Sequence, residues 1–157
     1  MDIPRMGLTT EFLYRAHVDV DEFLEVGDTF RGRRTIVKVK AGWFEGPKLK
    51  GEILPAGGDW FVMRPGGVAE ADVRDAYRTD DGHLIYVSYR GIINAAPEVW
   101  ARLARGEDVP YTEYYARMQP MFETAADNPY GWLNNILAVS VGKQGAQGIT
   151  YDVYQVL

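Results

Sequence analysis

The sequence contains no cysteine, which excludes disulfides, thiolate catalysis and cysteine metal sites. Histidine is almost as scarce, because only His17 and His83 occur and neither lies at the spacing of a zinc ligand pair. The sequence also has no Gly-x-Ser-x-Gly elbow, phosphate-binding loop or dinucleotide fingerprint. We therefore expect a protein without a metal and without a cofactor.

Positive charge and long apolar runs are also in short supply. The 17 basic residues are outnumbered by 22 acidic ones, the net charge is -5, and lysine and arginine form no long run. A phosphate-binding stripe is thus missing, and we expect no nucleic-acid partner. No apolar run approaches the ~18 residues of a membrane span, and residues 1–7 do not resemble a signal peptide. These features predict a cytoplasmic location and no membrane partner.

The residues that are present alternate between apolar and polar along much of the chain, which indicates β-strands. The pattern predicts nine strands within a single domain, 1–157. Their expected ranges are 8–20, 33–40, 43–54, 59–64, 68–79, 83–93, 111–124, 134–142 and 149–157. Residues 20–32 are interpreted as a connection, Asp80-Asp81-Gly82 as a hairpin turn, and 130–133 as a short helical turn. One helix is predicted from Pro97 to Gly106.

Many short strands with frequent turns favour a mainly β fold over a parallel sheet. We predict a closed or nearly closed antiparallel β-barrel of about eight to ten strands with one short helix. A barrel is preferred to a sandwich because charged residues recur at alternate positions in two long strands, and a polar lumen can hold them. A barrel of about eight strands can also hold one small ligand.

The densest turn chemistry lies between Gly42 and Trp60, where five glycines and two prolines interrupt a strand-forming stretch. Glycines in such a stretch mark bulges, corners or close approach of another backbone or a ligand. Glu45, Lys50, Asp59 and Trp60 would then stand at the barrel mouth. Alternatively, the glycines only shape the bend and these charges are solvated.

Charged residues on one face of two strands form the first candidate site. Asp72 and Arg74 share a face of strand 68–79, whereas its opposite face carries Ala71, Val73, Asp75 and Tyr77. Arg117 and Glu123 share a face of strand 111–124. If these faces point inward, Asp59, Asp72 and Glu123 are candidate acids or bases, and Arg74 and Arg117 can stabilise a substrate anion. The alternative is that all four are surface charges.

Aromatic residues with polar tips form a second candidate set, suited either to a pocket or to an ordinary β core. Its members are Trp60, Tyr86, Tyr115, Tyr130, Trp132 and Tyr154, together with Asn134. Combined with the glycine-rich stretch, the sequence predicts a ligand site formed by Glu45, Lys50, Trp60, Tyr86, Tyr115, Trp132 and Asn134.

Several motifs in matching order resemble one bacterial family over nearly the whole chain. They are Phe44-Glu45-Gly46-Pro47, Leu49-Lys50-Gly51, Leu54-Pro55, Gly58-Asp59-Trp60, Arg78-Thr79-Asp80-Asp81-Gly82, Phe122-Glu123-Thr124 and Trp132-Leu133-Asn134. The chain resembles uncharacterised protein family three-eleven, also called domain of unknown function thirty-two thirty-seven. This resemblance implies a small β-barrel similar to the calycin and allene-oxide-cyclase type. It implies no particular reaction and no catalytic residue.

Three functions follow from these patterns and remain open at the level of sequence. The first is a cofactor-independent isomerase, cyclase or lyase that transfers protons on a small, partly apolar organic substrate. The second is a carrier or sensor barrel that binds such a molecule without chemistry. The third is a structural or interaction protein with a filled barrel. Weak self-association as a homodimer is expected from the fold alone.

Overall fold

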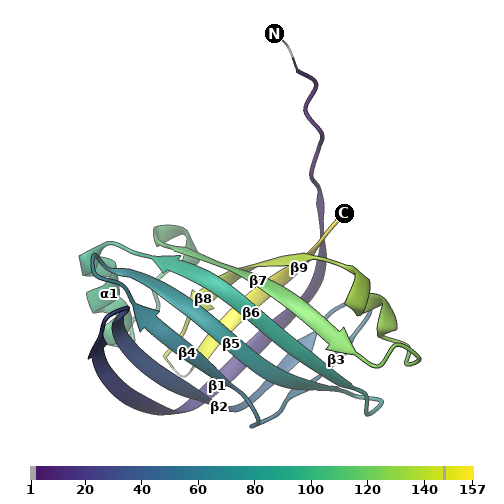
Figure 1. Cartoon of the computed structure of the whole chain (residues 1–157), viewed down its shortest axis with the longest axis horizontal. Helices are drawn as coiled ribbons and strands as arrows, with labels where there is room; N and C mark the ends of the chain where they lie inside the picture. Colours follow the sequence, from purple (N-terminus) through teal and green to yellow (C-terminus); the bar gives the residue numbers. More distant parts are fainter. Residues whose placement is uncertain (1–2, 147) are drawn as a thin grey trace.

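The computed structural model describes residues 3–146 and 148–157, and their strands form one antiparallel sheet (Figure 1). Strand β1 pairs with β9 on one side and with β2 on the other, so the sheet closes into a ring of eight strands. Strands β3 and β4 follow one another between β2 and β5, each pairing with both. The predicted closed antiparallel β-barrel is confirmed.

The elements have the following bounds. The strands are β1 Thr10–Thr29, β2 Gly32–Glu45, β3 Lys50–Ile53, β4 Gly58–Met63, β5 Val68–Thr79, β6 Leu84–Asn94, β7 Tyr115–Thr124, β8 Ala138–Gln144 and β9 Gly148–Val156. The helices are α1 Pro97–Ala104 and two short 3-10 turns, η1 Tyr111–Glu113 and η2 Gly131–Asn135. Among the described residues, no helix is both long and apolar enough to cross a membrane.

The predicted connection at residues 20–32 is wrong, because β1 continues to Thr29 and pairs with β2 along this length. Three irregularities in the ladder, starting at Asp19, Val20 and Glu25, shift the register between β1 and β2. Each shift breaks the period-two pattern in the sequence. The sequence pattern of a bulged strand therefore resembles that of a loop.

Two other boundaries differ from the prediction for a local reason. The predicted strands 111–124 and 134–142 begin later, at Tyr115 and Ala138, because η1 and η2 precede them. The Asn134 side chain accepts a hydrogen bond from the Thr124 amide at 2.8 Å and donates one to its carbonyl at 3.0 Å. Asn134 thus caps the end of β7 instead of joining a ladder. The predicted hairpin at Asp80–Gly82 and the helix beginning at Pro97 are confirmed.

The glycine-rich stretch from Gly42 to Trp60 places backbones close together, as predicted. A Cβ atom added at Gly51 would lie 2.0 Å from the carbonyl oxygen of Arg78 on β5, so no larger residue fits there. The tight ladder of β3 against β5 depends on this contact.

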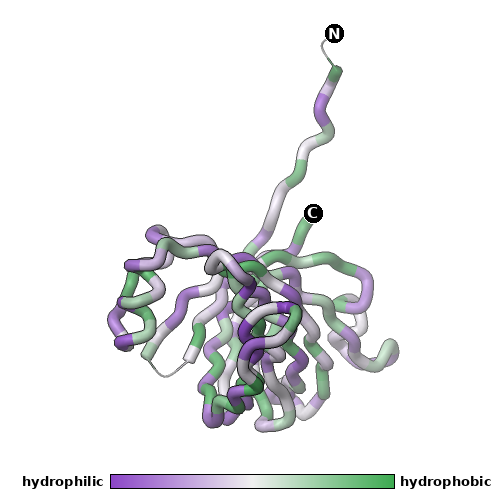
Figure 2. The backbone as a smooth tube through the Cα atoms, turned by 60° about the vertical axis from the view of Figure 1, so that its left-hand side comes forward, coloured by the Kyte–Doolittle hydropathy of each residue, from purple (hydrophilic) through white to green (hydrophobic). Residues whose placement is uncertain are grey.

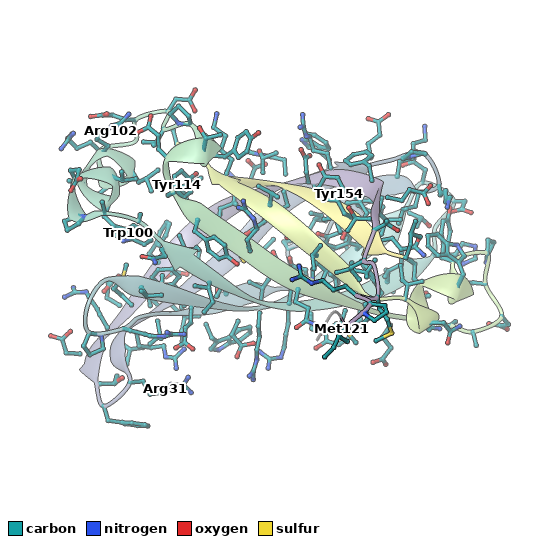
Figure 3. The ribbon with its side chains drawn as sticks, turned by 90° about the horizontal axis from the view of Figure 1, so that it is seen from above. Arg31, Trp100, Arg102, Tyr114, Met121 and Tyr154 are labelled. Atoms are coloured by element: carbon teal, nitrogen blue, oxygen red, sulfur yellow. The ribbon has the colours of Figure 1, made fainter. Side chains whose placement is uncertain are left out.

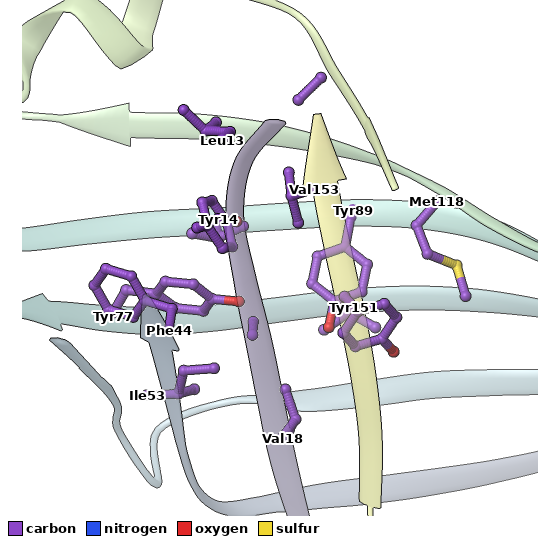
Figure 4. Packing of buried hydrophobic residues seen from close by; sticks show 14 of the residues in the cluster. Leu13, Tyr14, Val18, Phe44, Ile53, Tyr77, Tyr89, Met118, Tyr151 and Val153 are labelled. Atoms are coloured by element: carbon purple, nitrogen blue, oxygen red, sulfur yellow. The ribbon is translucent and has the colours of Figure 1, made fainter. Parts of the chain in front are cut away.

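Hydropathy alternates along the strands (Figure 2), and the buried positions of the strands are mostly apolar. One half of the barrel is filled by interlocking aromatic rings, shown in Figure 4. Tyr14 lies edge-on to Phe44, Tyr77 and Phe122 at centroid distances of 5.9, 6.1 and 6.2 Å, and Phe44 stacks on Tyr77 at 4.9 Å. Such contacts add to the free energy gained by burying the rings.

Candidate functional site

The other half of the barrel contains a cavity of about 350 Å³. Its walls are the inner faces of the strands and are mostly apolar, with Val37, Phe61 and Val73 among the lining residues. A mostly apolar cavity of this size suits a small organic ligand. Different elements line its two ends and position its polar groups.

Helix α1 lines the outer end, where Trp100 and Tyr114 lie together at one end of the barrel (Figure 3). The helix starts at Pro97, which suits the first helical turn. The indole Nε1 of Trp100 donates a 2.9 Å hydrogen bond to the carbonyl of Gly67 in the β4–β5 turn. The hydroxyl of Tyr114 accepts a 2.8 Å hydrogen bond from the Gln144 amide. These bonds fix both aromatic side chains at the cavity.

Two tyrosines from strands three positions apart in the ring form the floor of the cavity (Figure 4). Tyr89 on β6 and Tyr151 on β9 pack edge to face with centroids 5.6 Å apart. Gly142 lets the Tyr151 ring lie flat on β8, since an added Cβ would sit 3.2 Å from Cε1 of Tyr151. Burial raises the pKa of both phenols, so they remain protonated hydrogen-bond donors.

Asp59 on β4 contributes a carboxyl group to the cavity wall. Its Oδ1 accepts a 2.9 Å hydrogen bond from the Asp72 amide of β5. Burial raises the pKa of Asp59 to about 6, the hydrogen bond from Asp72 opposes this shift, and the charges of Asp72 and Arg34 act in opposite directions. Asp59 therefore changes protonation near neutral pH.

Asp75 on β5 is a second carboxyl group, buried just beyond the floor with only 2% of its surface exposed. Its Oδ2 accepts a 3.3 Å hydrogen bond from the Tyr89 hydroxyl. Within the described residues, Oδ1 has no hydrogen-bond partner and lies against Gly57. Burial raises the pKa of Asp75 to about 7, partly opposed by Tyr89 and reinforced by Asp59. Strongly perturbed pKa values of this kind are typical of functional sites.

The sheet register aligns these groups in one row. Asp59 pairs with Val73, and Val73 pairs with Tyr89, so Asp59 and Tyr89 lie two strand spacings, roughly 10 Å, apart. Asp75 is two residues from Val73 on the same face. A ligand above Val73 would thus have a carboxylate on one side and a phenol, backed by a carboxyl group, on the other. This arrangement can accept a proton at one position and donate one at another.

A further carboxyl group, Glu25, lines the cavity near the β1–β2 hairpin. It accepts a 2.9 Å hydrogen bond from the Thr35 hydroxyl and forms a 3.3 Å ion pair with Arg33. Its charge is therefore already compensated, in contrast to that of Asp59.

The prediction that the charged faces of strands 68–79 and 111–124 point inward is wrong. Ala71, Val73, Ala116 and Met118 line the cavity instead, and their neighbours Asp72, Arg74, Arg117 and Glu123 lie on the outer face. The apolar residues of each strand take the interior because burying unpaired charges costs far more. Outside, Arg74 covers Trp60 at 5.3 Å and Arg117 covers Tyr115 at 5.0 Å.

The predicted ligand-binding residues are also dispersed over the outside. Lys50 forms a 3.4 Å ion pair with Asp80, Glu45 is exposed, and Tyr86 is 42% exposed on the outer wall. Trp132 lies under the ammonium group of Lys48 at 5.7 Å, and Asn134 caps β7. Asp59 is thus the one residue of the predicted set that the structure places in the cavity wall.

Sequence reasoning missed Asp75, Tyr89 and Tyr151 as site residues. A signal for Asp75 was present, because it is the single charged residue on the face of β5 that also carries Val73 and Tyr77. For Tyr89 and Tyr151 no local signal exists, since their contact joins strands 62 positions apart in the chain. Among the described residues, no group of three or more histidine or acidic side chains is placed to hold a metal ion.

The closed ring and its mostly apolar cavity define a small antiparallel β-barrel with a ligand-sized interior. Residues 8–156 match the family model described as protein of unknown function, DUF3237, and the chain belongs to this family. The resemblance found in the sequence motifs is thereby confirmed.

Known relatives agree with this assignment. A protein of family UPF0311 from Rhodopseudomonas palustris is 33% identical over 150 residues, covering 96% of this chain and 97% of the relative. A crystal structure of a protein of unknown function from the same species has a TM-score of 0.91 at 32% identity, covering 98% of this chain and all of the other. A β-barrel-like protein from Acinetobacter baumannii has a TM-score of 0.84 at 34% identity, with coverages of 99% and 100%.

A more distant structure shares the fold alone. It is a crystal structure of an enzyme from Penicillium herquei, with a TM-score of 0.74 and 18% identity, and each chain is covered in full.

Proposed function

We propose that this barrel binds a small, partly apolar organic molecule in its cavity and transfers protons on it without a cofactor. The supporting observation is the pair of carboxyl groups at an apolar cavity, Asp59 in the wall and Asp75 behind the floor tyrosine, with raised pKa values of about 6 and about 7. General acids and bases work best when their pKa lies near the operating pH.

The two sides of the row in the wall take different roles in this proposal. Asp59 is ionised above pH 6 and serves as the base that removes a proton from a carbon next to a carbonyl group. In its protonated form Asp75 can donate to the Tyr89 oxygen, which frees the Tyr89 hydroxyl proton to be donated to the oxygen where negative charge develops. Isomerisation, cyclisation and elimination all share this first step.

The experiment is hydrogen–deuterium exchange at carbon. A panel of small aryl ketones is incubated with the protein in D₂O, and mass spectrometry follows replacement of the hydrogen next to the carbonyl. The wild type is expected to accelerate exchange for those ketones that bind, and Asp59→Asn to reduce the acceleration by about 10²-fold or more. The matched control is Glu123→Gln, which removes one negative charge from the outer face and should leave exchange unchanged.

A carrier or sensor barrel is the second candidate, favoured by the mostly apolar lining of the cavity. Ketones that raise the melting temperature without accelerated exchange in the wild type would favour this function. Equal exchange rates in the wild type and Asp59→Asn would contradict the catalytic role of Asp59.

A further inference from the structure

The cavity is unbalanced in charge. Its lining includes two carboxyl groups, Asp59 and Glu25, but no lysine, arginine or histidine. Glu25 has its counter-ion in Arg33 at the mouth. Asp59 forms no ion pair among the described residues, because Arg74 and Arg90 pair with Asp72 instead, and its negative charge is not neutralised from inside the cavity.

The surroundings of Asp59 reinforce this imbalance. On the outer side, Asp72 contributes a like charge and Arg34 an opposite one. On the inner side, Asp75 and Tyr151 both interact with Asp59, and neither can provide positive charge. One carboxylate oxygen, Oδ1, is held by the Asp72 amide, and no hydrogen bond within the described residues engages Oδ2.

Aromatic rings complete the environment. Phe61, Tyr89 and Trp100 line the same cavity as Asp59. The faces of aromatic rings attract cations, and a carboxylate with neighbouring rings is a favourable site for an ammonium group. An anion would meet the carboxylate of Asp59 with no cationic side chain in the cavity lining to offset the repulsion.

We infer that the ligand of this cavity is an apolar amine in its protonated form, with Asp59 as its counter-ion. This inference rests on the proposed function, because it assumes that the same cavity binds the ligand. The ammonium charge would keep Asp59 ionised, which is the form that the proposed function uses as its base. The expected order of affinity is amine, then uncharged analogue, then carboxylate.

The experiment uses three probes with one two-ring body, namely 2-naphthylmethylamine, 2-naphthalenemethanol and 2-naphthoate, and isothermal titration calorimetry. At pH 7.5 the amine is expected to bind about tenfold more tightly than the alcohol, and the carboxylate about tenfold more weakly. At pH 5, where Asp59 is mostly protonated, the amine should lose about tenfold in affinity while the alcohol changes little.

Three variants separate specific pairing from general attraction. Asp59→Asn should remove the advantage of the amine over the alcohol, and Asp59→Glu should retain part of it. Glu123→Gln changes the net charge equally on the outer face and should preserve the whole ranking. Melting curves confirm that each variant is folded before titration.

The outcomes distinguish this inference from the proposed function. If the alcohol binds as tightly as the amine, or the carboxylate binds best, the amine inference is wrong while ligand binding in the cavity stands. If the amine keeps its advantage in Asp59→Asn, Asp59 is not the counter-ion. If no probe binds the wild type, the amine inference fails, and the ketone exchange experiment alone decides the proposed function.

Discussion

The two halves of the barrel share most of their strands but differ in the size of their inward side chains, and β5 passes through both. Its inner face carries Ala71 and Val73 in the hollow half, Asp75 at the boundary and Tyr77 in the filled half. Small residues leave the cavity open, and large rings fill the remainder of the lumen. The buried carboxyl group of Asp75 lies at the boundary between the hollow half and the filled half.

This division separates stability from binding. Side chains in the filled half contact other side chains on all sides and contribute dispersion and burial free energy. Side chains of the hollow half contact a cavity on one side and give up part of that energy. The hollow half is therefore the region where a ligand can bring additional contacts.

The largest expected effect is on stability in the filled half. Phe44 is 1% exposed and packs against Tyr14 and Tyr77, so Phe44→Ala should lower the free energy of unfolding by about 3–5 kcal/mol. The matched variant Phe61→Ala removes the same atoms from the cavity wall and should cost about 1–2 kcal/mol. Urea denaturation measures both values, and equal losses would show that the two halves do not differ in packing.

The boundary is expected to show in the dependence of stability on pH. Asp75 holds its proton with a pKa of about 7 in the folded barrel, against 3.8 in the unfolded chain. Unfolding between pH 4 and 7 therefore releases a proton, and the free energy of unfolding falls as the pH rises through this window, by roughly 3–4 kcal/mol. Asp59 contributes in the same direction between pH 4 and 6. Below pH 4 and above pH 7 these two groups add no slope.

Replacing the boundary carboxyl tests this assignment. Asp75→Asn cannot ionise, so denaturation midpoints at pH 5 and pH 8 should differ less for the variant than for the wild type. The variant should gain stability relative to the wild type at pH 8, because no buried charge has to form there. An unchanged pH slope would mean that Asp75 does not hold its proton as its burial indicates.

Enlarging a buried alanine to leucine should also distinguish the two halves, with a smaller effect on stability. Ala16 and Ala71 are both buried, but Ala16 lies in the packed core and Ala71 lines the cavity. Ala16→Leu should therefore cost about 1–3 kcal/mol through overpacking, whereas Ala71→Leu should cost less than about 1 kcal/mol. Ala71→Leu should also weaken probe binding, measured by calorimetry. A severe loss of stability in Ala71→Leu would indicate that the cavity is not available to a side chain.

The sequence predicts the wall of this barrel better than its interior. Alternation reveals strands and turns such as Asp80–Gly82 because both depend on neighbouring residues. It does not by itself tell which face is inside, and the assignment of the Asp72 and Arg74 face to the lumen was wrong for this reason. The contact of Tyr89 with Tyr151 depends on closure of the ring, so nothing local to either residue encodes it. Asp59 was found because a glycine-rich turn marked its neighbourhood.

The smallest expected effect on stability concerns the outer face, which serves as a control for both halves of the interior. Arg74 covers Trp60 and lies 3.4 Å from the Asp72 carboxylate, but these groups are largely solvated. Arg74→Ala should therefore cost at most about 1 kcal/mol of stability, measured by urea denaturation. Ketone exchange and probe affinity should match the wild type, because Arg74 does not line the cavity. A tenfold loss of exchange in this variant would indicate that the outer charged face belongs to the site. A solvated arginine that does not contact the ligand should not affect exchange.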